Sequence, residues 1–380
     1  MLMSPTFLLF LVAVHASSAA TNYQVILTEH SPTPILSSSN PVGQGNSQGC
    51  LIFNPSYIQK SPTFQREGLL VRECCGDTCT GHGRQFSLNQ DRAERIAFAP
   101  CNLSTATCSD AFPSKVFNLD PQADTEDPRA FYNPYDEYYY LFYYRSPAVS
   151  QSKCTGQQCT VQLSRTKTPL DASSYEYINT LPWHRNGCCF IKPKGQKTYC
   201  YWGEGPGPFE GLGISVTEDI STGQFEQVTW SHGNTTDNAS SPLTSDQKWM
   251  LPLGSTLSEI KLEAGTHFHQ LEDGNLITFY AAATPGWVAH GNYTVGWLIV
   301  DGQNPSKILQ RSAKHILVPT FDYETLCPGQ KSCKYIGERH NVIFLSSAVR
   351  IDKNKFRLFY GAGDGNVGTA LVNIVSNVPL

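Results

Sequence analysis

Residues 139–146 read Tyr-Tyr-Leu-Phe-Tyr-Tyr-Arg-Ser, and residues 160–166 read Thr-Val-Gln-Leu-Ser-Arg-Thr. Both segments are rich in aromatic and β-branched residues, which favour extended strands over helices. Small and polar residues separate the two segments, as expected of a turn or loop between neighbouring strands. The pair therefore predicts two consecutive strands of one antiparallel sheet.

The same pair of segments recurs along the chain. Aromatic first strands are expected at 69–74, 139–146, 199–205, 276–283 and 357–363, and their followers at 84–89, 160–166, 211–217, 294–301 and 368–374. The first strands begin roughly 60 to 80 residues apart, which is typical of repeated four-strand units in a propeller. No long segment has a 3.6-residue apolar period, so helices should be rare. The sequence predicts an all-β five-bladed β-propeller, mostly of four antiparallel strands per blade, with a pair of two-sheet sandwiches as the alternative.

The composition narrows the class of protein further. The 380 residues include 28 Lys and Arg against 32 Asp and Glu, a formal net charge of −4, which argues against a nucleic-acid partner. Charged residues make up 16% and aromatic residues 11%, which excludes a disordered chain or a coiled coil. The 30 Gly and 24 Pro fit many short strands joined by turns.

The N-terminal segment has the features of a secretory signal. Residues 1–20 contain an apolar run followed by small residues, with cleavage expected after Ala19 or Ala20. That run is too short to span a bilayer, and no later stretch approaches 18 apolar residues, so we expect a soluble protein without a membrane partner, secreted or in the secretory lumen. Residues 21–48 are rich in Ser, Pro, Asn and Gly and predict an irregular leader. Residues 49–380 would form the single propeller domain.

The cysteines and glycosylation sequons agree with this compartment. All 13 Cys follow the signal, which favours disulfides, and the odd count leaves one thiol free or linking two chains. Zinc at the cluster Cys74, Cys75 and Cys79 is the less favoured alternative, because no His follows at finger spacing. Short loops predict the pairs Cys101–Cys108, Cys154–Cys159 and Cys327–Cys333, with a further cluster of Cys188, Cys189 and Cys200. Potential glycan sites are Asn102, Asn234, Asn238 and Asn292.

Polar residues stand before the aromatic strand in successive repeats. In the second repeat, Glu126-Asp127-Pro128-Arg129 places paired acids beside an arginine that would orient a carboxylate. A solvated turn is the simpler interpretation of any one such motif, but the same location is polar in every later repeat. Because propeller strands converge on a central funnel, we expect these groups to meet there. The later groups are Trp183 to Asn186, Lys261 to Gly265 with His267 and His269, Arg339 to Asn341, and Asp364.

In their order and spacing these motifs resemble glycoside hydrolase family 130, the mannoside phosphorylases and β-mannosidases on a five-bladed propeller. The chain would be a divergent, secreted, eukaryotic-type member, and the resemblance runs from about Asn54-Pro55 to the C-terminus. Its carriers are Glu126-Asp127-Pro128-Arg129, Arg185-Asn186, Lys261 with Ala264-Gly265, Gly296 to Asp301 with Pro305, Arg311-Ser312, Pro319, Tyr323-Glu324, and Tyr360-Gly361-Ala362-Gly363-Asp364.

The resemblance assigns roles to individual residues. It makes Asp127 the general acid and matches Arg185, Asn186 and Lys261 to positions that hold inorganic phosphate in family phosphorylases. A further family Arg is missing, since Glu204 ends that aromatic segment, and a family His is replaced by Tyr280.

These departures favour hydrolysis over phosphorolysis. A phosphate dianion needs several charge-assisted donors, and Glu204 and Glu263 are acids where the phosphorylases tend to have Arg and Gly. Either Glu is a candidate base for activating water in an inverting hydrolase. A solvated loop charge is the alternative for each.

The remaining candidates would contact substrate. Arg129, Arg185, Asn186, Lys261 and Asp364 would shape the sugar and nucleophile site. His267 and Tyr280 are further candidate contacts, and hydrogen bonding is favoured over zinc binding by His267 and His269. Trp183, Trp202, Tyr280 and Trp287 would stack on sugars or pack within blades.

We therefore predict a secreted glycosidase acting on β-linked mannosides or related glycans, without a metal or cofactor. The expected partner is an oligosaccharide or glycan substrate, joined by inorganic phosphate if the enzyme is a phosphorylase. The alternatives are a mannoside phosphorylase that releases mannose 1-phosphate, a non-catalytic glycan-binding propeller and a purely structural secreted domain.

Overall fold

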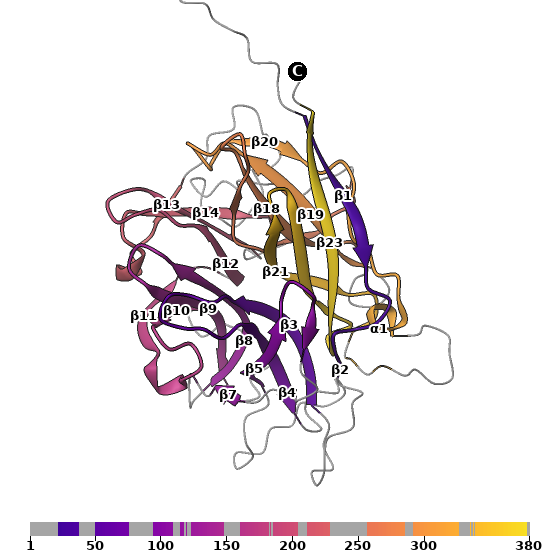
Figure 1. Ribbon diagram of the computed structural model, residues 1–380, viewed down its shortest axis with the longest axis horizontal. Coiled ribbons are helices and arrows are strands. Elements are labelled where there is room, and N and C mark those ends of the chain that lie inside the picture. The colour runs from indigo at the N-terminus through magenta and orange to yellow at the C-terminus, as the bar shows by residue number, and fades with distance from the viewer. Residues whose placement is uncertain are drawn as a thin grey trace, which may run out of the picture.

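The computed structural model describes residues 22–37, 50–75, 94–108, 115–117, 119, 123–147, 160–181, 183, 185–203, 211–228, 257–285, 292–326, 335, 337 and 339–377. These residues form five small antiparallel sheets, the blades of a five-bladed β-propeller, which confirms the predicted fold (Figure 1). Within these ranges the helices are α1 (Asp322–Thr325) and two short 3₁₀ turns, η3 (Ala172–Ser174) and η4 (Ile220–Thr222). No helix of the described residues is long and apolar enough to cross a membrane.

The first three blades follow one another along the chain. Blade 1 comprises β3 (Cys50–Ile58), β4 (Gly68–Cys75), β5 (Glu94–Asn102), β6 (Thr107–Cys108) and β7 (Lys115–Phe117). Blade 2 comprises β8 (Ala123–Asn133), β9 (Tyr138–Pro147), β10 (Thr160–Thr166) and β11 (Glu176–Leu181). Blade 3 comprises β12 (Arg185–Phe190), β13 (Thr198–Gly203), β14 (Gly213–Thr217) and β15 (Glu226–Gln227).

The last two blades complete the ring. Blade 4 comprises β16 (Lys261–Ala264), β17 (His269–Gln270), β18 (Leu276–Ala283), β19 (Tyr293–Val300) and β20 (Ile308–Arg311). Blade 5 comprises β21 (Ile343–Asp352), β22 (Lys355–Ala362) and β23 (Asn366–Asn377), together with β1 (Asn22–His30) and β2 (Leu36–Ser37). The predicted aromatic first strands are therefore the second strand of each blade. Four predicted followers match the third strands, but blade 1 uses β5, and residues 84–89 lie outside the described ranges.

Alternating side chains of one strand pack against two different blades. In β9, Tyr139 and Leu141 join the core shared with blade 1, whereas Tyr140 and Phe142 join the core shared with blade 3. Because both faces of such a strand are buried, its sequence is an almost continuous apolar run. A hydrophobic cluster of this kind fills each junction between consecutive blades, including the junction of blades 5 and 1.

The N-terminal strand closes the ring, which corrects one prediction. Residues 21–48 were expected to be an irregular leader, but β1 pairs antiparallel with β23 from Asn22↔Asn377 to His30↔Ala370. Figure 1 shows β1 in indigo beside β23 in yellow. The polar composition of this segment suggested irregular structure. However, β1 is the outer strand of its blade, where alternate side chains face solvent and are therefore polar.

A buried polar group fastens this closure, and we call it the closing cluster: His30, Tyr323, Glu324 and Tyr360. Glu324 Oε1 lies 2.6 Å from His30 Nε2 and accepts a hydrogen bond from the Tyr360 hydroxyl at 2.7 Å. The Tyr323 hydroxyl lies 2.8 Å from that of Tyr360 and donates to the Ser31 carbonyl. The cluster ties β1 to α1 and β22.

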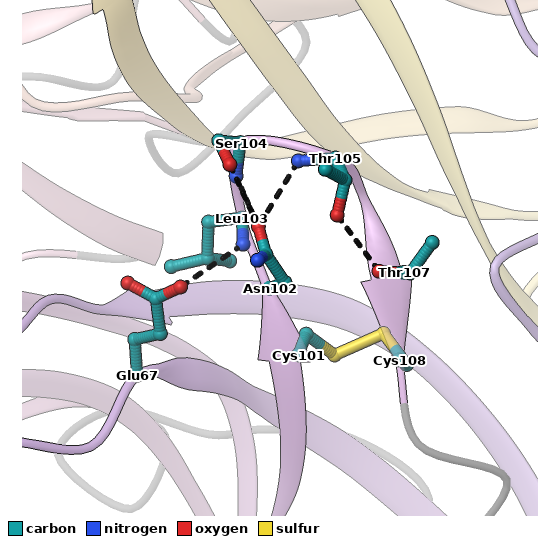
Figure 2. The surroundings of a disulfide bond; sticks show 8 residues. All are labelled: Glu67, Cys101, Asn102, Leu103, Ser104, Thr105, Thr107 and Cys108. Atoms are coloured by element: carbon teal, nitrogen blue, oxygen red, sulfur yellow. Dashed lines mark hydrogen bonds between the residues drawn. A yellow bond between two sulfur atoms is a disulfide. The ribbon is translucent and has the colours of Figure 1, made fainter.

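Two disulfides lie within the described residues. Cys101–Cys108, predicted from its short spacing, staples the hairpin of β5 and β6 beside the sequon residue Asn102 (Figure 2). Cys189–Cys200 joins β12 to β13. Cys188 is a free and buried thiol, and burial raises its pKa to about 12. The other two predicted pairs lie outside the described residues.

Candidate active site

The innermost strands of three consecutive blades share one local distortion. Each carries a β-bulge, between Phe53 and Ser56 in β3, between Glu126 and Arg129 in β8, and between Arg185 and Cys188 in β12. The second residue of each bulge has positive φ: 49° at Asn54, 50° at Asp127 and 52° at Asn186. Asn and Asp tolerate this left-handed conformation better than other non-glycine residues. A bulge re-aims side chains, and here it directs three Asx residues toward neighbouring blades.

Asp127 lies at the centre of a buried ion network and is only 3% exposed. Its Oδ1 accepts from Asn54 Nδ2 at 2.7 Å and from Arg72 Nη1 at 3.1 Å. Its Oδ2 accepts from Arg185 Nη1 at 2.9 Å. Three side chains from blades 1 and 3 thus hold both oxygens of this blade 2 carboxylate.

Two further acids extend this network, and we call Glu94, Glu126 and Asp127 with Arg72 and Arg185 the acid cluster. Arg72 Nη2 lies 2.7 Å from Glu94 Oε2 and 3.0 Å from Glu126 Oε2. Arg185 Nη1 contacts Glu126 Oε2 at 3.0 Å as well as Asp127. Glu94 and Glu126 thus share one nitrogen of Arg72.

The acids of this cluster differ in proton affinity. Burial would raise the pKa of Asp127, but the guanidinium groups of Arg72 and Arg185 outweigh it and hold that pKa well below its usual range. The same balance lowers the pKa of Glu126. Burial dominates at Glu94 and raises its pKa to about 8, although Arg72 opposes the shift. The site therefore favours the anion at Asp127 and the protonated acid at Glu94.

Glu263 forms a second acidic centre one blade further on. Its Oε2 accepts from Asn186 Nδ2 at 2.6 Å, its Oε1 lies 2.8 Å from Lys261 Nζ, and the Tyr293 hydroxyl donates to the same Oε1. A Cβ added to Gly203 would lie 2.5 Å from the Glu263 Cα, so only a glycine lets β13 approach β16 this closely. Since Arg185 and Asn186 are consecutive, they link Glu263 to the acid cluster.

Arg129 and Arg185 occupy different surroundings. Arg129 is fully buried and donates to the Pro128 carbonyl at 3.0 Å and to the Leu345 carbonyl at 3.5 Å, so it braces the bulged strands. The Arg185 side chain is 24% exposed, the largest fraction among the charged residues of both acidic centres, and its guanidinium stacks 3.8 Å over the ring of Tyr144. The side reached by solvent is therefore the Arg185 side.

Tyr280, His267 and His269 have surroundings different from those of the two acidic centres. The Tyr280 hydroxyl donates to Glu259 Oε1 at 3.1 Å and accepts from Arg311 Nε at 3.2 Å, in a separate buried group of blade 4. His267 Nδ1 accepts from the Cys189 amide at 2.9 Å between blades 3 and 4, and burial lowers its pKa to about 3. His269 packs on Phe356, and burial lowers its pKa to about 4.

The other predicted site residues are distributed as follows. Asp364 lies in the turn between β22 and β23, with φ of 47°, and Oδ2 is 4.0 Å from Arg339 Nε. Trp183 and Trp202 pack in the core between blades 2 and 3, where both indoles donate to Ser215 Oγ. Glu204 and Trp287 lie outside the described residues.

Sequence reasoning missed four residues that contact the acids: Asn54, Arg72, Glu94 and Tyr293. One signal was present for Asn54, because Asn54-Pro55 repeats the Asx-Pro pair of Asp127-Pro128 at the matching innermost strand. Arg72 and Glu94 carry no such signal, since they lie on the second and third strands of blade 1, and Arg72 contacts Asp127 only through the packing of blades.

Two other features bear on ligands. Among the described side chains, no group of three or more His, Cys, Asp or Glu is arranged to hold a metal ion. A hollow of about 490 Å³ lies beside β15, lined in part by Thr217, Asp219 and Phe225, and it contains none of the predicted site residues.

Comparison with known proteins identifies the relatives of this chain. The sequence model of the family described as β-1,4-mannooligosaccharide phosphorylase, glycoside hydrolase family 130, matches residues 113–378. No curated protein gives a match.

Three solved structures show the shared fold. A member of the family 130 mannoside phosphorylases, described as glycoside hydrolases that target β-1,2-mannosidic linkages in Candida mannan, is 16% identical with a TM-score of 0.62, over 94% of this chain and 95% of its own. The β-1,2-mannobiose phosphorylase of Listeria innocua is 15% identical with a TM-score of 0.63, over 92% and 96%. A glycosyl hydrolase of Bacteroides ovatus is 15% identical with a TM-score of 0.57, over 84% and 83%.

Proposed function

Since this chain belongs to glycoside hydrolase family 130, we propose that it is a secreted, inverting glycoside hydrolase that cleaves β-linked mannosides or related glycans. Asp127 is the proposed general acid and Glu263 the proposed base. One observation carries the choice of hydrolysis: the Glu263 carboxylate lies in hydrogen-bond contact with Asn186 and Lys261, two residues matched to the phosphate site of family phosphorylases.

The Glu263 carboxylate disfavours phosphate at this place. Asn186, Lys261 and Tyr293 already donate to its oxygens, so a phosphate dianion would compete for these donors and face a buried like charge. Arg72 and Arg185 are likewise paired with the carboxylates of the acid cluster. A water molecule meets no such repulsion, and a carboxylate is the group that would take its proton.

The proposed reaction consumes one water molecule. Asp127 transfers a proton to the glycosidic oxygen as the bond between that oxygen and the anomeric carbon breaks. Glu263 takes a proton from water as the water oxygen bonds to the opposite face of the same carbon, so the configuration inverts. Glu204 is the second candidate base. Asp127 needs a proton for its role, although the two guanidinium groups hold its pKa low before substrate binds.

The proposal of secretion rests on several compatible features. The Cys101–Cys108 and Cys189–Cys200 disulfides suit an oxidising compartment. The sequon residues Asn102 and Asn292 are exposed. Expression of the full chain in a secreting eukaryotic cell tests the proposal: we expect protein in the medium that begins after Ala19 or Ala20. Intact, cell-retained protein would contradict it.

Product analysis tests the enzymatic function. Wild-type protein is incubated with β-1,2-mannobiose and β-1,4-mannobiose, each with and without inorganic phosphate. We expect phosphate-independent release of mannose, with the α anomer appearing first in a proton NMR time course. Asp127→Asn should lower the rate by about 10²- to 10⁴-fold, the usual contribution of a general acid. Asp136→Asn is the matched control, because Asp136 lies in the turn between β8 and β9 and accepts from the Tyr138 amide and the Tyr140 hydroxyl, outside both acidic centres.

Each other outcome contradicts a defined part of the proposal. Mannose 1-phosphate formed only with phosphate would replace hydrolysis by phosphorolysis. The β anomer appearing first would contradict inversion. Sugar binding by wild type and Asp127→Asn, without turnover of any substrate, would indicate a glycan-binding propeller and would remove the acid role of Asp127.

A further inference from the structure

The surroundings of Asp127, the proposed acid, favour the form of this residue that has lost its proton. Asp127 accepts hydrogen bonds from Asn54, Arg72 and Arg185, and this arrangement favours the ionised carboxylate. A general acid must nevertheless carry a proton when the substrate bond breaks. The proton therefore has to come from a neighbouring group or from solvent.

Glu94 and Glu126 form a pair of buried acids beside Asp127. Two carboxylates that share one buried place repel each other when both are ionised, so the protonated form of one of them is favoured. The same Arg72 nitrogen contacts an oxygen of each, at 2.7 Å for Glu94 and 3.0 Å for Glu126. Both residues are buried, with exposed fractions of 5% and 6%. Burial raises the pKa of Glu94, whereas the guanidinium groups of Arg72 and Arg185 lower the pKa of Glu126, so Glu94 is the member of the pair that favours the protonated form.

Resting on the hydrolysis proposed above, we propose that Glu94 is a positioning residue that stores the catalytic proton and supplies it to Asp127 through Glu126. Glu126 precedes Asp127 in the bulge, and Arg185 Nη1 contacts both carboxylates, at 3.0 Å and 2.9 Å. Glu94 acts through these two neighbours and is not itself placed at the reacting atoms.

The proton transfers balance over one turnover. Sugar hydroxyl groups replace guanidinium contacts at Asp127, which raises the proton affinity of its carboxylate. The O–H bond at Glu94 breaks as one forms at Glu126, and Glu126 passes a proton to Asp127, so the total charge is unchanged. Asp127 then gives that proton to the leaving oxygen. Glu94 regains a proton from solvent, and the proton that Glu263 took from water returns to solvent.

The surroundings of Glu94 favour the storage of a proton on this residue over its exchange with another group. Its backbone N–H donates to Asp124 Oδ1 at 3.4 Å, and the Cys74 sulfur lies 3.9 Å from its Oε1. Cys74 is disulfide-bonded and carries no thiol proton. The described titratable and charged side chains that face the acid pair are Arg72 and Cys74 from β4, Asp124, Glu126 and Asp127 from β8, and Arg185 from β12.

The variant Glu94→Gln distinguishes a role of Glu94 in proton storage from a purely structural role. The amide oxygen still accepts from Arg72 and the amide nitrogen still donates to Glu126, so Gln copies the protonated carboxyl but has no transferable proton. Glu94→Asp retains a carboxyl group and should recover part of the lost activity. Glu73→Gln is the matched control, because Glu73 is also buried in blade 1 but pairs with Arg95, at 2.9 Å, outside the acid cluster.

Two measurements are made on each full-length variant after circular dichroism confirms folding. Infrared titration should show a protonated-carboxyl band that disappears near pH 8 in wild type and Glu73→Gln and is absent from Glu94→Gln. The kcat for mannobiose hydrolysis should fall by about 10²-fold in Glu94→Gln. Its residual activity should also lose the alkaline decline near pH 8, which a structural role would not change.

Two results would overturn the inference: no difference between the infrared bands of wild type and Glu94→Gln, or unchanged kcat and pH profile in folded Glu94→Gln. The two proposals fail separately. A wild type that has the band but no turnover would refute hydrolysis and proton delivery while supporting storage at Glu94. Turnover without the band would refute storage alone.

Discussion

The closing cluster and the acid cluster are both buried polar groups, yet they are built differently. In the closing cluster, Glu324 Oε1 pairs with His30 and Tyr360, and Oε2 accepts from the Thr320 and Phe321 amides at 2.7 Å and 3.0 Å. None of these residues has positive φ. The acid cluster brings three acids together on a bulged strand, with Asp127 at a φ of 50°.

The two clusters also differ in how many of their buried polar atoms lack a hydrogen-bond partner. Among the described residues, the buried side-chain atoms that make no hydrogen bond include Arg72 Nε of the acid cluster and Asn54 Oδ1 and Asn186 Oδ1 at the bulges beside it. No atom of the closing cluster is among them. Backbone strain and unpaired polar groups cost stability, so they persist where the surrounding fold imposes them, often at functional sites. The comparison supports the proposal that the closing cluster serves stability and the acid cluster serves chemistry.

The largest expected effect is on the closing cluster. Glu324→Ala should lower the free energy of unfolding by about 3–5 kcal/mol, because it leaves His30, Tyr360 and two backbone amides without their buried acceptor. Urea unfolding measures the loss, and kcat of the folded fraction should stay at the wild-type value. Glu324→Gln, which keeps one acceptor oxygen, should lose less. A large fall in kcat with unchanged stability would reverse the comparison.

The strain at the bulges gives a smaller and more specific effect. At Asn54, Ala should be less stable than Gly by about 1–2 kcal/mol, because a Cβ opposes the left-handed conformation. The matched position is Asn366, which is fully buried near the closing cluster and has no positive φ. There Gly should be less stable than Ala by about 0.5–1 kcal/mol. Equal Ala-to-Gly differences at the two sites, measured by thermal unfolding, would show that the bulge stores no strain.

The smallest expected effect is a difference in pH dependence. Because the pKa of Asp127 is lowered on folding, its contribution is present above about pH 4 and is lost as the pH falls. Burial raises the pKa of Tyr360, so its contribution is present below about pH 10 and is lost as the pH rises. Asp127→Asn should flatten the acid side of the curve of unfolding free energy against pH, and Tyr360→Phe the alkaline side. Each slope is at most about 1.4 kcal/mol per pH unit. Unchanged slopes in both variants would contradict the assignment.

The strand pattern of this fold could be predicted because it is local. Residues 139–146 pack on two blades, so both faces of this strand are buried. The resulting run of apolar residues, with β-branched residues nearby, predicts a buried strand from the sequence alone. The strand at residues 22–30 was not predicted, because a half-exposed outer strand has only a weak pattern of apolar residues. Its partner β23 also lies more than 300 residues away in the chain.

The candidate site was predictable only in part. Asp127, Arg185, Asn186, Lys261 and Glu263 stand beside aromatic strands in successive repeats, and the structure brings them into two linked acidic centres. Tyr280 and His267 stand at similar places in the sequence, yet their side chains pack between blades 3 and 4. A shift of one residue along a strand turns a side chain to the opposite face, and the sequence pattern does not settle that register.

The sequence by itself determined the five repeats, the all-β class and the polar groups that precede the aromatic strands, because strand periodicity and turn chemistry are properties of neighbouring residues. Only the tertiary structure decided that Arg72 meets both Glu94 and Asp127 and that β1 closes the ring. These contacts join segments from different strands and blades, and their geometry depends on how whole sheets pack. The ionisation of the acids depends on the same packing, because burial and the placement of guanidinium groups set each pKa.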